Sequence, residues 1–208
     1  MTPRILCLHG GGASAAIFRA QCRNLVSGLR DNYELIFVNG PIVSNPGPGI
    51  LPVFADFGPY YLWFSAQEYT TDGLAILSQA LDDALIREGL TPADISGVIG
   101  FSQGAAAACV LLLQARFGDS RWARLSFAVL ICGACNQNLI NLIGNPLSVR
   151  SMHVHGLKDQ WLSGGQMLST CFETKLAETI EFQGGHHIPR NPQDIEQILE
   201  FIRNASVN

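Results

Sequence analysis

The chain of 208 residues is 48% hydrophobic and 14% charged, a composition that excludes intrinsic disorder and allows one domain with a sizeable core. Its formal net charge of −4 argues against nucleic acid as the main partner, and it contains no run of about 20 apolar residues that would predict a membrane span. Six cysteines, most of them within apolar runs, indicate a reduced, cytoplasmic protein.

Short apolar runs alternate along the chain with longer segments of helical periodicity. In chain order, the pattern predicts strands at 4–9, 33–38, 97–100, 127–131, 152–155 and 179–182, and helices at 15–29, 71–88, 103–117, 165–174 and 193–203. Strands separated by helices are typical of right-handed crossovers, which give a parallel sheet with helices on both faces. We therefore expect one α/β domain that spans residues 1–208.

Residues 41–66 break this alternation after the second predicted strand. The motif Asn45-Pro46-Gly47-Pro48-Gly49 disfavours regular structure, and aromatic rings crowd the residues that follow it. We interpret the segment as an insertion or lid that supplies an apolar pocket. The alternative, almost as well supported, is a hydrophobic plug that only covers the sheet.

The motif Gly100-Phe101-Ser102-Gln103-Gly104 lies between a predicted strand and the predicted helix at 103–117. A serine between two glycines at such a turn is typical of a nucleophile elbow. In that turn the hydroxyl stands above the sheet, and the following helix directs its N–H groups toward the reaction centre. An ordinary glycine-rich turn is the alternative for these five residues taken alone.

Chemically suggestive residues follow three other predicted strands. His9-Gly10-Gly11-Gly12 follows the first strand, Asp159 follows the strand at 152–155, and Gly184-Gly185-His186-His187 follows the last. Active sites of parallel sheets form beyond the carboxyl ends of the strands, so we expect these residues to lie near the serine. The chain order serine, aspartate, histidine is one that hydrolytic triads use on such sheets. We expect His9 itself to order its loop by hydrogen bonds.

Each residue of this set has a defined chemical role in the hypothesis. His186 would accept the proton of Ser102 and later return it to the leaving group. Asp159 would hold the imidazole in the required tautomer. The backbone N–H groups of Gly11 and Gln103 would form an oxyanion hole for the negative oxygen that the attack creates.

Several residues offer alternatives to these assignments. His187 competes with His186 for the role of the base, and Asp56 and Asp72 are the other candidate acids. Cys132-Gly133-Ala134-Cys135 has the spacing of a redox or metal half-site, but no second pair or histidine partner lies at metal-ligand spacing. We therefore predict a plain pair of thiols, with no metal and no cofactor.

The motifs together resemble the fungal serine hydrolases of the α/β-hydrolase superfamily, relatives of the human ovarian-cancer-associated protein. The matching segments span nearly the full chain and are Ile5–Gly10, Val38–Pro41, Phe57–Tyr61, Gly100–Gly104, His155–Asp159 and Gly184–Pro189. In this family the catalytic histidine directly follows the glycines of the last motif, which favours His186 over His187. The chain departs from the family where Gly58-Pro59-Tyr60-Tyr61 replaces a Gly-Trp-Trp-like pair, so the resemblance does not define the shape of the acyl pocket.

The resemblance implies the α/β-hydrolase fold and hydrolysis of an acyl ester or thioester through an acyl-enzyme on Ser102. Some members resemble the lovastatin-type thioesterases, which release a polyketide chain from the acyl carrier domain of a synthase. We favour a thioesterase or esterase of fungal polyketide biosynthesis, which would take a small acyl ester or thioester and meet an acyl carrier protein domain. The expected substrate contacts are Phe57, Tyr60, Tyr61, Trp63, Trp161 and His187.

Other functions stay open on the sequence alone. They are a general carboxylesterase, a lyase or cyclase that uses the same triad, and a catalytically silent binder of a small ligand. Arg19 and Arg23, one helical turn apart, offer a local basic face for an acidic carrier domain, although a solvated helix surface is the simpler explanation.

Overall fold

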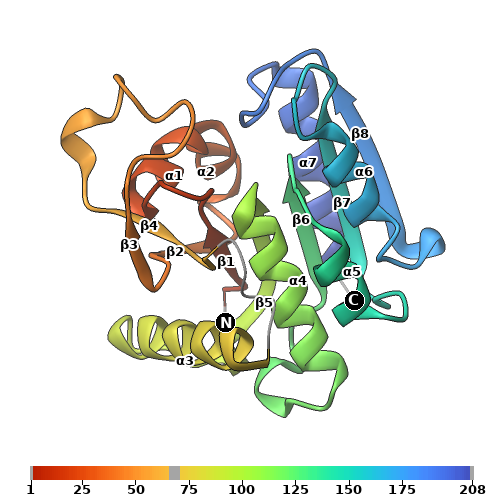
Figure 1. The fold of residues 1–208 in the computed structure, drawn as a ribbon. Helices are drawn as coiled ribbons and strands as arrows, with labels where there is room; N and C mark the ends of the chain where they lie inside the picture. The colour runs from red at the N-terminus through yellow and green to blue at the C-terminus, as the bar shows by residue number, and fades with distance from the viewer. Residues whose placement is uncertain (1, 66–70, 207–208) are drawn as a thin grey trace.

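A parallel sheet of six strands forms the centre of the molecule (Figure 1). The computed structural model describes residues 2–65 and 71–206, without the side chains of Thr71 and Asp72. The strand order is β2-β1-β5-β6-β7-β8, and every neighbouring pair in it is parallel. The strands are β1 (Arg4–Leu8), β2 (Glu34–Val38), β5 (Ile95–Phe101), β6 (Phe127–Ile131), β7 (Arg150–Gly156) and β8 (Ala177–Phe182). All six predicted strands are confirmed.

Helices cover both faces of this sheet (Figure 1). One face carries α1 (Ala15–Gln21), α2 (Arg23–Leu29) and α7 (Pro192–Ala205). The other carries α3 (Thr71–Arg87), α4 (Gln103–Arg116), α5 (Gln137–Ile143) and α6 (Leu162–Ser169). The predicted α/β class is therefore confirmed. Within the described residues, no helix has the length and apolar character needed to cross a membrane.

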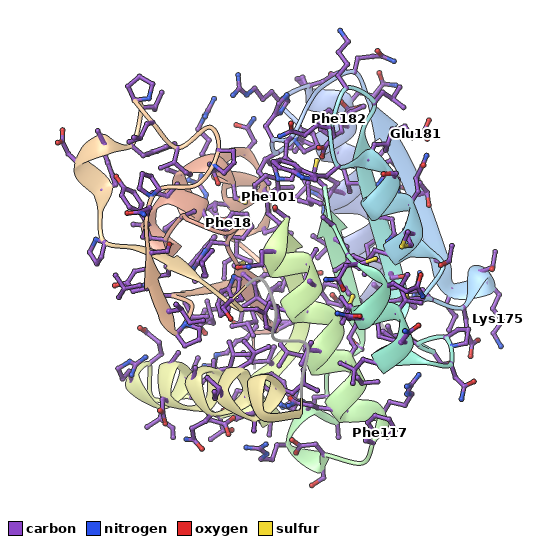
Figure 2. All side chains as sticks on the ribbon, viewed as in Figure 1. Phe18, Phe101, Phe117, Lys175, Glu181 and Phe182 are labelled. Atoms are coloured by element: carbon purple, nitrogen blue, oxygen red, sulfur yellow. The ribbon has the colours of Figure 1, made fainter. Side chains whose placement is uncertain are left out.

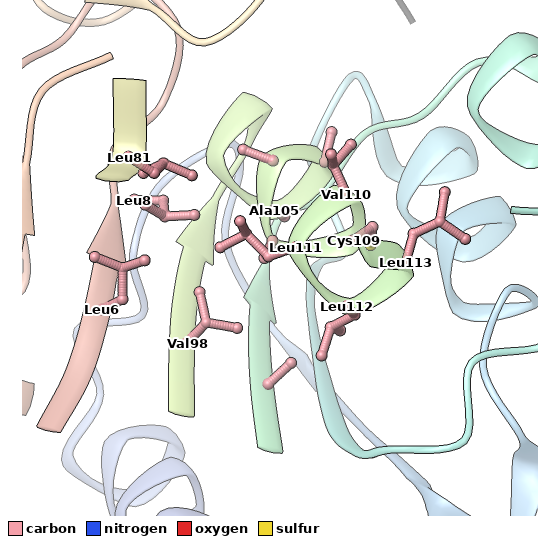
Figure 3. Packing of buried hydrophobic residues seen from close by; sticks show 14 of the residues in the cluster. Leu6, Leu8, Leu81, Val98, Ala105, Cys109, Val110, Leu111, Leu112 and Leu113 are labelled. Atoms are coloured by element: carbon pink, nitrogen blue, oxygen red, sulfur yellow. The ribbon is translucent and has the colours of Figure 1, made fainter. Parts of the chain in front are cut away.

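Helix α4 is buried along most of its length. Every residue from Gly104 to Leu113 is buried, because this stretch is apolar on all sides of the helix. Figure 3 shows Ala105 and Leu111 of α4 beside Leu8 and Val98 of the sheet, in one hydrophobic cluster. The turn that precedes α4 is thus supported by a closely packed core.

The helical segments differ from their predicted bounds at three places. The predicted helix at 15–29 is divided at Cys22, whose ψ of 12° departs from helical geometry. Helix α5 was not expected; its first turn is capped by Asn136, whose side chain accepts from the Leu139 N–H. The predicted helix at 165–174 is α6, which begins earlier and ends at Ser169.

The segment predicted as an insertion carries a small antiparallel sheet of its own, β3 (Ile42–Ser44) and β4 (Tyr60–Leu62). Backbone hydrogen bonds join the segment to the glycine loop after β1. The Gly12 N–H donates to Tyr61 O at 2.9 Å, the Tyr61 N–H to Ala13 O at 2.7 Å, and the Gly47 N–H to Gly12 O at 2.9 Å. The segment, described up to residue 65, is therefore held against the carboxyl end of β1.

His9 connects the same two parts of the chain through its buried ring. The Gly40 N–H donates to His9 Nε2 at 3.0 Å, so Nδ1 carries the proton and donates to Gly10 O at 2.7 Å. The Trp63 indole donates to His9 O at 2.7 Å. Burial lowers the pKa of His9 to about 4, against a smaller opposing effect of the hydrogen bond with Gly10. The ring is therefore a neutral structural link, as expected from the sequence.

The lowered pKa of His9 predicts that the folded protein becomes less stable as the pH falls from 6.5 to 4. In that window an unfolded His9 binds a proton and the folded one does not, so the free energy of unfolding falls as the pH is lowered, by up to about 3 kcal/mol. His9→Asn keeps a neutral side chain at every pH. Its free energy of unfolding, measured by urea denaturation, should therefore change less with pH between these values than that of the wild type. His153 and His155, whose pKa values burial also lowers, add to the slope of this pH dependence in both proteins. Identical slopes would contradict the role given to His9.

Candidate active site

Ser102 occupies the turn between β5 and α4 in a strained backbone conformation. Its φ of 54° and ψ of −119° lie in a region that side chains disfavour by about 1–3 kcal/mol. The Ser102 N–H donates to Ile131 O at 3.0 Å. A Cβ on Gly104 would lie 2.1 Å from Leu8 O, and one on Gly100 would lie 2.4 Å from Gly104 O, so no larger residue fits at either position. The turn has the geometry of a nucleophile elbow.

Ser102, His186 and Asp159 form a continuous chain of hydrogen bonds. His186 Nδ1 lies 2.7 Å from Asp159 Oδ2, and His186 Nε2 lies 2.8 Å from Ser102 Oγ. The carboxylate can only accept, so Nδ1 carries the proton and Nε2 accepts from the serine hydroxyl. The other oxygen, Asp159 Oδ1, accepts from the Trp161 N–H at 2.8 Å. Asp159 is thereby fixed at both oxygens, with its side chain only 2% exposed.

The neighbouring strands β7 and β8 bring the aspartate and the histidine together. Just beyond β7, the Leu157 N–H donates to Phe182 O at 3.0 Å and the Lys158 N–H donates to Gly184 O at 2.8 Å. The loops after β7 and β8 are therefore paired where they leave the sheet. Phe101 and Phe182, the last residues of β5 and β8, lie toward the same end of the molecule (Figure 2).

The alternative base and the alternative acid Asp56 take no part in this chain of hydrogen bonds. His187 Nδ1 is 2.8 Å from Ile188 O, and the His187 ring packs against Phe182 with ring centroids 5.3 Å apart. Asp56 is exposed in the short turn Ala55–Phe57. The third alternative, Asp72, is outside the described side chains.

Two backbone N–H groups adjoin the serine without a protein acceptor. Within residues 2–65 and 71–206, neither the Gly11 N–H nor the Gln103 N–H donates to another group. The two residues are neighbours, since a Cβ on Gly11 would lie 3.3 Å from Gln103 Oε1. Such a pair of free donors beside a nucleophile is suited to binding a developing oxyanion.

The side chain of Gln103 performs a structural task that the sequence did not reveal. Gln103 Oε1 accepts from the Trp63 N–H at 2.8 Å, and Gln103 Nε2 donates to Phe64 O at 3.0 Å. These bonds fix the chain that follows β4 to the first turn of α4. One residue thus supplies a free backbone donor to the site and anchors the neighbouring segment.

A cavity of about 820 Å³ opens beside Ser102 and His186. Its apolar wall comes from the segment between β3 and β4 and from the end of β4, with Ile50, Val53, Phe54 and Leu62. None of these four residues was expected to contact substrate. Their signal in the sequence is the apolar content of Ile50-Leu51-Pro52-Val53-Phe54, which directly follows the Pro-Gly motif.

Of the six expected substrate contacts, Trp161 and His187 line this cavity and the remaining four do not. The expectation for those four is corrected by where their side chains lie. Trp63 is 1% exposed in the core, and Phe57 is 50% exposed on the surface. Tyr60 places its hydroxyl 2.8 Å from Phe54 O, and Tyr61 pairs with β3 in the small sheet. Their rings stabilise the segment and do not form the wall of the cavity.

Cys132, the residue directly after β6, also lies at the site. Its φ of 46° is unusual for a residue with a side chain, and its thiol is buried. Burial, and then the nearby charge of Asp159, raise the pKa of Cys132 to about 12, so the thiol is neutral and unreactive. Ligand atoms of Cys132, Asp159 and His186 lie within 4.8 Å of one another, but the last two already bond to each other. In the sequence, the position of Cys132 directly after a predicted strand was the signal that could have placed it at the site.

Comparison with known proteins identifies relatives along nearly the whole chain. A profile of the family described as "Serine hydrolase (FSH1)" matches residues 1–198. The protein named Esterase FUS5 of Gibberella moniliformis is 36% identical over 210 residues, which cover 96% of this chain and 85% of that protein. The dihydromonacolin L-(lovastatin nonaketide synthase) thioesterase of Aspergillus terreus is 34% identical over 238 residues, which cover 98% and 92% respectively.

A solved structure supports the fold. The crystal structure of the Bacillus cereus carboxylesterase matches with a TM-score of 0.63 and 19% sequence identity, over 98% of this chain and 89% of that one. At this identity the likeness concerns the fold alone. The predicted α/β-hydrolase fold is confirmed.

The Gln103 side chain is expected to stabilise the fold independently of the chemistry. Gln103→Ala removes the hydrogen bonds with the Trp63 N–H and with Phe64 O, which should lower the free energy of unfolding by about 1–3 kcal/mol in urea denaturation. Gln79→Ala is the matched control, because it removes only the exposed bond with Asp83 in α3. Equal effects of the two substitutions would contradict the anchoring role.

The two adjacent histidines should separate in steady-state kinetics. His186→Ala removes the group bonded to both Ser102 and Asp159, and kcat should fall by about 10⁴–10⁶-fold. His187→Ala alters only the wall of the cavity, so its main effect should be on KM. A severe loss of kcat in His187→Ala with a mild one in His186→Ala would reverse the assignment.

Proposed function

The chain belongs to the serine hydrolase (FSH1) family, and on that premise we propose that it hydrolyses an acyl thioester or ester through a covalent intermediate on Ser102. The observation that carries the proposal is the hydrogen-bonded chain from Asp159 through His186 to Ser102, beside the free N–H groups of Gly11 and Gln103. These are the parts that acyl transfer to a serine requires.

The first half of the reaction forms the acyl-enzyme. Ser102 Oγ attacks the carbonyl carbon while its proton passes to His186 Nε2. Asp159 stabilises the imidazolium, and the Gly11 and Gln103 N–H groups stabilise the negative oxygen, each such donor being worth about 2.7–4 kcal/mol in the transition state. The bond to the leaving group then breaks, and the leaving thiolate or alkoxide takes the proton from Nε2.

The second half returns the enzyme to its starting state. A water molecule attacks the acyl carbonyl while His186 Nε2 takes its proton. The bond to Ser102 Oγ breaks, the serine regains that proton, and a carboxylic acid leaves. The site therefore needs no group beyond its own side chains, its backbone donors and water.

The substrate class that we propose rests on the cavity and on the relatives. A volume of about 820 Å³ suits a small organic acyl group, and Ile50, Val53 and Phe54 favour an apolar one. One relative is named a thioesterase of the lovastatin nonaketide synthase and another an esterase. We therefore favour a polyketide acyl thioester, presented on an acyl carrier protein domain, over a simple oxygen ester. A general carboxylesterase is the second candidate.

Substitution of the serine tests the chemistry. Ser102→Ala should lose about 10⁶-fold in kcat on acyl thioesters and oxygen esters alike, because the covalent intermediate cannot form. Ser27→Ala, on the exposed side of α2, is the control and should retain full activity. Near wild-type turnover by Ser102→Ala would contradict the proposal.

The same assay identifies the reaction and the substrate. In heavy-oxygen water, hydrolysis places one labelled oxygen in the released acid, whereas a cyclisation or elimination does not. Thioesters and oxygen esters of one acyl series should then be compared by kcat/KM. We expect the thioesters to be preferred; preference for short oxygen esters would favour the general carboxylesterase.

A further inference from the structure

The cavity beside Ser102 has a charge that differs from that of the whole chain. The formal net charge is −4, yet no aspartate or glutamate lines the cavity among the described residues. Two arginines, Arg23 and Arg190, do line it. A negatively charged protein thus presents a positively charged wall at its reaction centre, which favours an anionic ligand there.

Both arginines are exposed and available for a ligand. In the described part of the chain, neither forms an ion pair or a side-chain hydrogen bond, whereas Arg121 and Arg203 are paired with carboxylates. Arg19, which the sequence grouped with Arg23, does not belong to this wall. Its guanidinium lies over the Phe37 ring, 5.3 Å from the centroid, and it faces a different depression. The basic pair at the site therefore comes from two separate segments.

The reaction indicates which side of the cavity the leaving group occupies. The leaving atom must face His186 Nε2 to receive its proton. Residues 187–190 continue directly from that histidine along the cavity wall. Arg23 begins α2, which packs against α7 where Gly28 meets Leu199. Arg190 thus lies on the side of the leaving group, and Arg23 adds a second positive charge to the lining of the same cavity.

The apolar wall occupies the other side. It belongs to the segment that is bonded to the glycine loop through the Gly47 N–H and Gly12 O. In Figure 1 this segment, in orange, and the loop between β8 and α7, in blue, rise above the sheet on opposite sides. The wall formed by Ile50, Val53 and Phe54 is therefore suited to the acyl chain, and the two arginines are suited to an anionic leaving group.

We propose that Arg23 and Arg190 bind a phosphate on the thiol arm of the substrate. The proposal rests on the proposed function, since it concerns the leaving group of that reaction. The shared chemistry is a phosphopantetheinyl thioester, carried either by coenzyme A or by a carrier protein. Guanidinium groups suit this ligand because their planar N–H donors match phosphate oxygens in pairs. The arginines thereby distinguish a thioester on a phosphate-bearing arm from a neutral ester of the same acyl chain.

The test compares one acyl chain on three thiols: coenzyme A, a phosphopantetheinylated carrier protein, and N-acetylcysteamine, which has no phosphate. Arg23→Gln and Arg190→Gln should each raise KM for the phosphate-bearing thioesters about tenfold, with kcat retained. The N-acetylcysteamine thioester should be turned over at the wild-type rate, which also shows that the variants are folded. Arg203→Gln, which loses only an exposed ion pair with Glu196, is the matched control.

The outcomes separate the sources of the phosphate. A KM increase for the carrier-bound thioester identifies a carrier protein as the donor, and one confined to coenzyme A identifies the free cofactor thioester. An equal loss on all three thioesters, or no change on any of them, would overturn the proposal.

A second measurement stays informative if the chain prefers oxygen esters. Free coenzyme A should then inhibit ester hydrolysis competitively in the wild type and about tenfold more weakly in each arginine variant. Inhibition that is the same in the variants would overturn the phosphate site while leaving the hydrolase chemistry intact. If the wild-type protein hydrolysed neither thioesters nor oxygen esters, that result would contradict the proposed function and not the phosphate site.

Discussion

The strained turn at Ser102 is the constraint on which the rest of the site depends. It exists only because the backbones of β1, β5 and α4 approach one another more closely than any side chain would allow, with Gly100 and Gly104 at the contact. The close approach to Leu8 O places the loop after β1 next to the first turn of α4. As a result, Gly11 and Gln103 are neighbours, and among the described residues their N–H groups have no acceptor. The buried residues of α4 hold this arrangement rigid.

The second level of organisation joins an irregular segment to that rigid centre. Gln103 bonds to backbone groups of the segment, His9 bonds to the Gly40 N–H just before it, and the buried Trp63 contacts both. The wall formed by Ile50, Val53 and Phe54 is therefore attached to the same elements that carry the serine. A change in this segment is expected to alter the shape of the cavity without moving the hydrogen-bonded triad.

Much of the fold and of the triad could be predicted from the sequence, because the signals are local. Alternating strands and helices fix a parallel sheet, and residues that follow its strands must meet at one edge. The aromatic segment was harder to predict, since the directions of Tyr60, Tyr61 and Trp63 depend on tertiary hydrogen bonds and not on periodicity. The same reason explains why Arg190 was missed. Its place at the site depends on a cavity that it shares with Arg23 of α2, which is distant in the sequence.

The central claim is that Ser102 is the residue that becomes acylated, and covalent labelling tests it most directly. The wild-type protein should be treated with a fluorophosphonate, digested and mapped by mass spectrometry. We expect a single adduct on the peptide that contains Ser102, and we expect it to be lost on substitution of His186 by alanine. An adduct on another residue, or no adduct on an active preparation, would contradict it.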